Sequence, residues 1–138
     1  MLKLNLGICV AVLVAALAGW IWGVSGTSAK ARALQTLQLR DELLEARAAV
    51  LDARLDIYSV NFGEASRHFE AARSGVRAAS QQLNSLGRQD DVKRLELALT
   101  RIDEAQRLAG QLNQDANARA AEGAKAIADV LGTVPVDK

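Results

Sequence analysis

NFGEASRHFEAA, residues 61–72, places an aromatic or small apolar residue at every third or fourth position. These positions are Phe62, Ala65, Phe69 and Ala72, and their spacing puts all four on one face of an α-helix. An alternation of large rings and alanines lets such a face press closely against a neighbouring helix. The stretch therefore predicts the start of a packed helix in an all-helical protein.

The ends of this helix are marked by capping residues. Asn61 and Glu64 form an Asn-x-x-Glu pattern, in which the asparagine accepts from a free helical amide and the glutamate reaches back. Gly87 tolerates the left-handed conformation that commonly ends a helix. We therefore expect a helix over residues 62–86, and its apolar seam continues through Val76, Ala79, Leu83 and Leu86.

Two further seams flank this helix. The one over residues 28–60 follows a heptad pattern with a single polar exception, Asp41. Its apolar residues are Leu34, Leu37, Leu44, Ala48, Leu51, Leu55 and Tyr58. The other, over residues 90–131, begins near Asp90 or Asp91, whose charges favour a helix N-terminus. It reads Val92, Leu95, Leu99, Ile102, Ala105, Leu108, Leu112 and Ala116, and Gly132 and Pro135 follow its end.

Residues 4–24, LNLGICVAVLVAALAGWIWGV, contain no charged side chain. A helix of this length, at about 1.5 Å per residue, measures roughly 31 Å and matches the hydrocarbon thickness of a bilayer. Trp20 and Trp22 stand at one end, where indole rings favour the headgroup layer. The pattern predicts a transmembrane anchor over residues 1–27. The alternative is a cleaved signal peptide with a processing site before Lys30.

The apolar segment also bears on partners and location. Gly7, Ala11, Ala15 and Ala18 fall near one stripe of the predicted membrane helix and would permit close approach of another transmembrane helix. The short positive N-terminus favours an inner-membrane protein with most of the chain in a bacterial periplasm. The single cysteine, Cys9, has no partner for a disulfide within the chain.

These patterns together predict the fold class. Alanine, leucine, glutamine and arginine dominate the chain, which is typical of long helices, and the short connections favour antiparallel neighbours. We expect a transmembrane helix followed by an antiparallel three-helix bundle or coiled-coil hairpin over residues 28–131, with a flexible tail at 132–138. The expected core consists of Leu34, Leu44, Leu51, Leu55, Tyr58, Phe62, Phe69, Val76, Leu83, Leu95 and Ile102.

Residues 58–72 resemble the second-helix signature of a tetratricopeptide repeat, carried here by the aromatic-alanine alternation from Phe62 to Ala72. In that family, stacked helix pairs form a groove that binds extended peptides, so the resemblance implies a peptide-binding adaptor. Asp56 stands where the family has an aromatic residue, and Arg77 stands near the family's proline. No second copy follows at the family's period of about 34 residues.

Few residues suggest chemistry. His68 and Glu64 form a Glu-x-x-x-His pair, but a metal site needs further ligands, so we expect neither a metal nor another cofactor. No glycine-rich phosphate loop or nucleophile elbow occurs, so we expect no catalytic residue and no small-molecule substrate. Charged side chains at i,i+4 spacing, Asp103 with Arg107 and Asp115 with Arg119, are predicted to pair on exposed helix faces.

The formal charge of +1, without a basic stripe, argues against nucleic acid as a partner. The sequence predicts a non-enzymatic, membrane-anchored accessory or scaffold subunit that contacts the lipid bilayer and other membrane protein subunits. One alternative is the peptide-binding adaptor. Another is a self-associating coiled coil that acts as an envelope spacer, which would leave heptad seams unfilled in the monomer. The predicted interface residues are Gly7, Ala11, Ala15, Ala18, Trp20, Trp22, Ala116, Ala120, Ala124 and Ile127.

Overall fold

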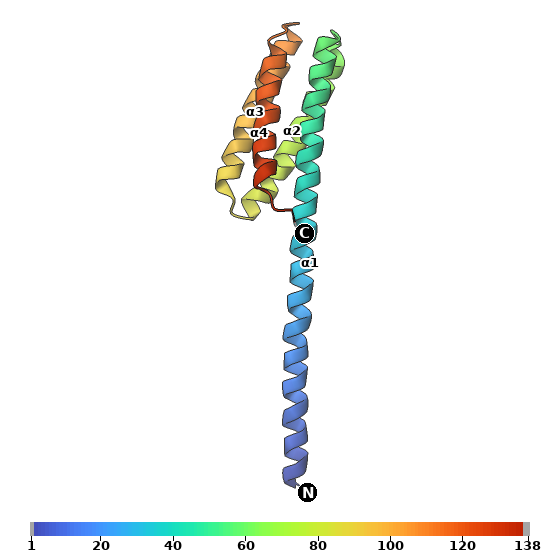
Figure 1. Cartoon of the computed structure of the whole chain (residues 1–138), viewed down its shortest axis with the longest axis vertical. Helices are drawn as coiled ribbons and strands as arrows, with labels where there is room; N and C mark the ends of the chain where they lie inside the picture. The colour runs from blue at the N-terminus through green and yellow to red at the C-terminus, as the bar shows by residue number, and fades with distance from the viewer. Residues whose placement is uncertain (1, 137–138) are drawn as a thin grey trace. The chain divides into compact units, whose positions relative to one another are not determined.

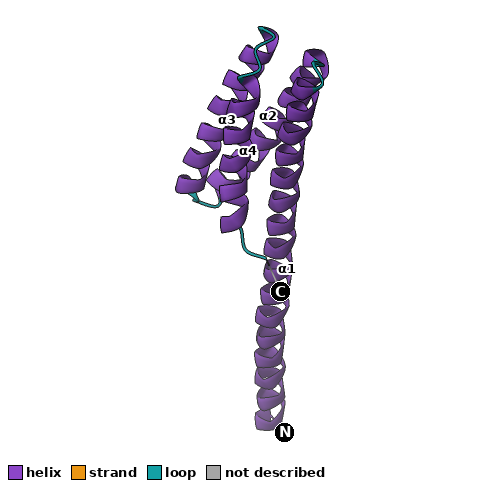
Figure 2. Cartoon of the chain, turned by 45° about the horizontal axis from the view of Figure 1, so that its top comes forward, coloured by secondary structure: helices purple, strands orange, loops and turns teal. Residues whose placement is uncertain are grey.

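A computed structural model describes the backbone of residues 2–136 and the side chains of residues 29–136. Four helices make up the described chain: α1 (Leu2–Tyr58), α2 (Phe62–Ser85), α3 (Gln89–Gly110) and α4 (Ala116–Thr133). Short loops join them, and the described residues contain no strand (Figures 1 and 2). The all-helical prediction is therefore confirmed.

The chain divides into two units, residues 1–35 and residues 36–138. The described backbone of the first unit is helical from Leu2 onward and belongs to α1. The second unit contains the rest of α1 together with α2, α3 and α4. All the packing described below belongs to this second unit.

Within residues 36–138 the helices run alternately up and down and form a four-helix bundle (Figure 1). Helix α3 packs on both α2 and α4. Polar contacts show that α1 completes the ring. Gln82 of α2 donates to Glu42 of α1 over 2.8 Å, and Arg40 of α1 donates to the carbonyl oxygen of Val134, just after α4, over 2.8 Å. Each helix therefore has two neighbours.

Small residues allow the helices to approach closely. A Cβ atom added at Gly75 of α2 would lie 3.0 Å from the Cβ of Ala46 on α1. A Cβ atom added at Gly123 of α4 would lie 3.1 Å from Cγ1 of Ile102 on α3. The apolar face of α2 is completely buried in this core, at Ala65, Phe69, Ala72, Val76, Ala79 and Leu83.

The prediction of three helices after residue 28 is wrong, because the expected helix over residues 90–131 is two helices. α3 ends at Gly110, and the chain turns before α4 begins at Ala116. Leu112 adopts a left-handed φ of 56° in this turn, and the Asn113 side chain accepts from the backbone amide of Asp115 over 2.8 Å. The turn folds the alanine-rich segment back onto the bundle. The predicted tail also starts too early, since α4 reaches Thr133 and Val134 is buried.

The predicted start of the first helix near residue 28 is also corrected. α1 is continuous from Leu2, so the glycine and hydroxyl residues at 25–28 do not interrupt it. In the part of the chain that the structure describes, no helix combines the length and the apolarity needed to span a bilayer. This finding overturns the predicted transmembrane helix. The side chains of residues 4–24, on which that prediction depended, lie outside the described ones.

All three interhelical turns use the same hydrogen-bonded motif. Residues in the left-handed region, Val60, Gly87 and Leu112, follow the ends of α1, α2 and α3 at φ values of 59°, 72° and 56°. In each turn the amide after this residue donates to a carbonyl five residues earlier, and the residue's own amide donates to a carbonyl three residues earlier. This is the Schellman arrangement, which normally favours glycine. Valine and leucine are strained in this conformation.

Replacing Val60 with glycine should therefore stabilise the protein. We expect Val60→Gly to raise the free energy of unfolding by about 0.5–1 kcal/mol, because relief of left-handed strain exceeds the added entropy of the unfolded chain. Gly87→Ala should lower it by about 1 kcal/mol, because its φ is positive. Urea denaturation followed by circular dichroism measures both.

Gly63→Ala is the matched control for this comparison. Gly63 lies in the first turn of α2, and no neighbouring atom lies within 4 Å of an added Cβ. This substitution should leave stability unchanged or raise it, because alanine is the better helix former. A loss of stability in Val60→Gly would show that the α1–α2 turn is not strained.

Candidate functional site

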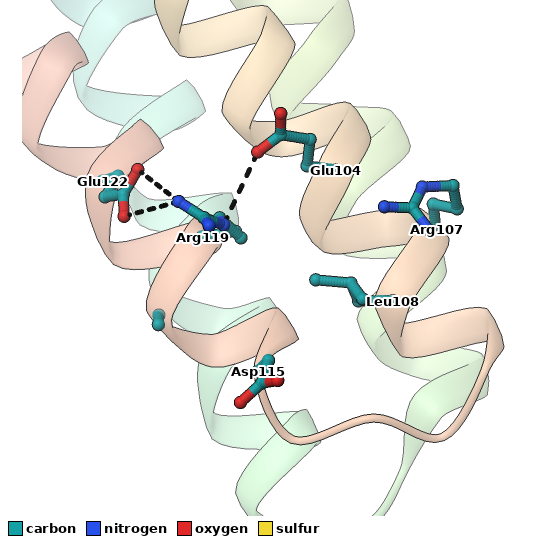
Figure 3. Close-up of a pocket in the computed structure, with 7 residues that line it drawn as sticks. Glu104, Arg107, Leu108, Asp115, Arg119 and Glu122 are labelled. Atoms are coloured by element: carbon teal, nitrogen blue, oxygen red, sulfur yellow. Dashed lines mark hydrogen bonds and ion pairs between the residues drawn. The ribbon is translucent and has the colours of Figure 1, made fainter.

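The described surface contains a cleft of ≈ 480 Å³ between α3 and α4 (Figure 3). Arg119 crosses this cleft from α4, with its Nη1 atom 3.0 Å from Glu122 and its Nε atom 3.6 Å from Glu104 on α3. Arg101 adds a second bridge between the same carboxylates, at 2.9 Å from Glu104 and 3.0 Å from Glu122. The cleft is lined by Glu104, Arg107, Leu108, Asp115, Ala118, Arg119 and Glu122.

Two arginines and two glutamates therefore neutralise one another in this cleft. The predicted pair of Asp115 with Arg119 does not form, because Arg119 is engaged by Glu104 and Glu122. Ion pairs that link two helices at a solvated surface position those helices and stabilise them modestly. The ion pairs in this cleft therefore hold α3 and α4 together.

A second polar network links α2 with α3. Arg73 lies 2.8 Å from Glu70 on its own helix and 2.8 Å from Asp103 on α3, so the predicted pair of Asp103 with Arg107 is not formed. Gln106 donates to Glu70 over 2.9 Å. This hydrogen bond, with the nearby guanidinium of Arg73, lowers the pKa of the Glu70 carboxyl. These contacts also join neighbouring helices.

His68 faces α1. Its Nδ1 and Nε2 atoms lie 3.8 Å from carboxylate oxygens of Asp52 and Asp56, respectively. The expected partner, Glu64, pairs instead with Arg67 over 3.1 Å. Among the described residues, no group of three or more histidine, cysteine, aspartate or glutamate side chains is arranged to hold a metal ion. His68 therefore contributes to the contact between α1 and α2.

Asp91, one of two residues expected at the start of α3, is buried in a polar cluster. It pairs with Arg88 and with Arg94, the latter over 3.2 Å, and accepts from the Thr133 hydroxyl over 3.1 Å. Arg88 also donates to the Thr133 carbonyl over 3.1 Å. The cluster ties the end of α4 to the α2–α3 turn. Its sequence signal is weak, because Asp91 and Thr133 are 42 positions apart.

We expect Asp91→Ala to lower the free energy of unfolding by about 1–2 kcal/mol, because it removes the buried carboxylate that pairs with Arg88 and accepts from the Thr133 hydroxyl. Asp90→Ala is the matched control. The Asp90 side chain is 92% exposed and its nearest cation, Lys93, is 4.0 Å away, so its loss should change stability by less than about 0.5 kcal/mol. Thermal and urea unfolding measure both. Equal effects would contradict a structural role for the cluster.

The predicted interface on the alanine-rich segment is wrong. Ala116, Ala120, Ala124 and Ile127 are all buried in the chain's own core, on the inner face of α4. Reciprocal hydrogen bonds hold this helix against α1. Arg54 Nε donates to Asn117 over 2.8 Å, and the Asn117 amide donates to the Arg54 carbonyl over 3.3 Å. The other predicted interface residues, Gly7, Ala11, Ala15, Ala18, Trp20 and Trp22, lie outside the described side chains.

The predicted core residues divide between two groups. Phe69, Val76, Leu83, Leu95 and Ile102 are fully buried, and Phe62 and Leu51 pack partly buried against the core. Four of the predicted core residues on α1, by contrast, are exposed: Leu34, Leu44, Leu55 and Tyr58. The predicted core seam of the first helix therefore lies on the wrong face, and of its predicted core residues Leu51 alone packs against the core.

The reason is that α1 carries two apolar seams. The inner seam, which contacts the bundle, consists of Leu39, Leu43, Ala46, Val50, Ala53 and Ile57. The outer seam consists of Leu37, Leu44, Ala48, Leu51, Leu55 and Tyr58, with Asp41 between its first two members. Both alternate by threes and fours, and at 3.6 residues per turn they lie on opposite sides of the helix. The inner seam is uninterrupted and contains no charged residue. This feature of the sequence distinguishes the buried face of α1 from the outer seam, which contains Asp41.

The outer seam is an apolar surface left open along one helix of the bundle. Leu37, Leu44, Leu55 and Tyr58 are 54%, 44%, 65% and 67% exposed. Large apolar side chains repeated along one helix face mark an association surface more often than isolated exposed leucines do. A comparison with known families, curated proteins and solved structures finds no match to this chain. The outer seam is therefore the strongest candidate functional site among the described residues.

Proposed function

We propose that this chain is a non-enzymatic scaffold subunit that associates with another protein through the outer seam of α1. The observation that carries this proposal is the exposure of Leu37, Leu44, Leu55 and Tyr58 at heptad spacing. An apolar helix face of this kind is suited to pack against another helix, because side chains three and four positions apart interlock with a facing helix.

The remainder of the bundle supports such a role. The inner seam holds one side of α1 in the core, so residues 36–58 are ordered as a helix before any partner arrives. The cleft between α3 and α4 holds ion pairs of Arg119 with Glu104 on α3 and with Glu122 on its own helix. Charged groups already paired in this way stabilise the bundle and offer little free charge to a reacting substrate.

The peptide-binding alternative receives less support. This alternative expects a groove between the first two helices after residue 28, whereas α1 and α2 touch closely at Ala46 and Gly75. The aromatic and small residues that carry the resemblance, Ala65, Phe69 and Ala72, are buried in the bundle core. Their burial favours a packing role for this motif.

Site-specific photo-crosslinking tests the proposal. The full chain would carry a photoreactive amino acid at Leu44 or Leu55 and be illuminated in the cells that make it. We expect discrete protein adducts at both positions. Lys125 is the control, since its side chain is 75% exposed on α4, away from the outer seam, and it should give none. Absence of adducts at both Leu44 and Leu55 would contradict the proposed association surface.

A further inference from the structure

We propose that the outer seam binds a second copy of this chain, with the two α1 helices side by side, parallel and in register, as a two-stranded coiled coil. This inference rests on the proposed function and names the partner. It is drawn from the heptad positions of α1 over residues 37–58 and from the charges that flank them.

The seam residues fit the positions of a parallel dimer. In a heptad lettered a to g, Leu37, Leu44, Leu51 and Tyr58 occupy d, and Asp41, Ala48 and Leu55 occupy a. Leucine at d is the arrangement of two-stranded parallel coiled coils, although the a positions here hold no β-branched residue. Three of the seam's four leucines thus lie at d, where such a dimer buries them against the same residues of the other copy. Of these, Leu51 is already partly buried against the bundle core.

The flanking charges select the orientation. Three arginines, Arg40, Arg47 and Arg54, occupy successive g positions, and Glu45 and Asp52 occupy e positions. In a parallel coiled coil, each g residue lies near the e residue of the next heptad on the other helix. Arg40 would therefore meet Glu45 of the other copy, and Arg47 would meet Asp52. An antiparallel arrangement would bring g beside g and e beside e, setting arginines against arginines.

Several of these side chains have unused capacity within the monomer. Among the described residues, Glu45 is exposed and has no ion pair. The contact of Asp52 is the long one to His68, at 3.8 Å. Arg40 donates one nitrogen to the Val134 carbonyl, which leaves other donors of its guanidinium. A second copy would supply the missing partners.

Asp41 distinguishes this seam from a permanent interface. It is exposed and stands at an a position, where it would face Asp41 of the other copy. A polar residue at a single a position fixes the register of a coiled coil and lowers its stability. The neighbouring g residue, Arg40, provides opposite charge across the pair. The geometry points to a reversible dimer whose register is set by Asp41.

Disulfide trapping tests the orientation. In the full chain carrying Cys9→Ser, a single cysteine would be placed by Leu37→Cys or Tyr58→Cys, at opposite ends of the seam. A parallel pair joins like positions, so each variant alone should give at least about tenfold more disulfide dimer than a Lys125→Cys control. An antiparallel pair would link only a mixture of the two variants. Adding Leu44→Glu and Leu55→Glu should abolish trapping.

Charge reversal tests the pairing directly. Arg47→Glu or Asp52→Arg alone places like charges across the dimer, and each should raise the dimer dissociation constant about tenfold in analytical ultracentrifugation. An equimolar mixture of the two variants should recover association, because both cross-pairs become opposite in charge. Lys93→Glu, on the exposed face of α3, should change the dimer dissociation constant less than about twofold. Asp41→Leu should lower it about tenfold.

The outcomes separate the two proposals. A monomeric chain that still gives photo-adducts with a different protein overturns self-pairing and leaves the scaffold role standing. Loss of both dimer and adducts overturns both. A dimer trapped only in the mixture of Leu37→Cys and Tyr58→Cys overturns the parallel orientation. Failure of mixed charge variants to recover association overturns the assigned pairing.

Discussion

Burial of the inner seam of α1 is the interaction on which the rest of the structure depends. Six apolar residues on one side of a single helix, from Leu39 to Ile57, form the surface against which α2 and α4 pack. Small residues make this contact close, as at Ala46 and Gly75. Close approach increases dispersion contacts between backbones and excludes water from the interface. It also decides which face of α1 remains outside.

The sequence was most informative where one seam stands alone. The predicted buried face of α2 is confirmed from Ala65 to Leu83, because none of its positions carries a charge. On α1 two seams of the same period compete, and periodicity cannot say which one meets the core. Large leucines and Tyr58 favoured the outer seam, whereas the smaller inner seam fits helices lined with alanine. Complementarity between helices decided the outcome, and a single helix does not contain that information.

Long-range polar contacts explain the other differences. The alanine-rich segment of α4 can bury little apolar area per residue, and on that ground the sequence predicts an interface with another protein there. Arg54 with Asn117 and Asp91 with Thr133 instead anchor its two ends to the bundle. Such pairs are separated by many positions, and neither partner is unusual in its local sequence. The turn at Leu112 could not be predicted from the sequence, because this apolar residue continues the three-and-four spacing of the preceding helix. Its positive φ appears in the structure alone.

A helix with two seams can couple folding to association. A short isolated helix is marginal in water, because nucleation is unfavourable and ordering costs entropy. Here the bundle has already ordered residues 36–58 through the inner seam, so a partner at the outer seam need not meet that cost again. This preorganisation lets a short seam, weakened by Asp41, still support association. It also keeps that association reversible, since the bundle retains its own core when the partner leaves.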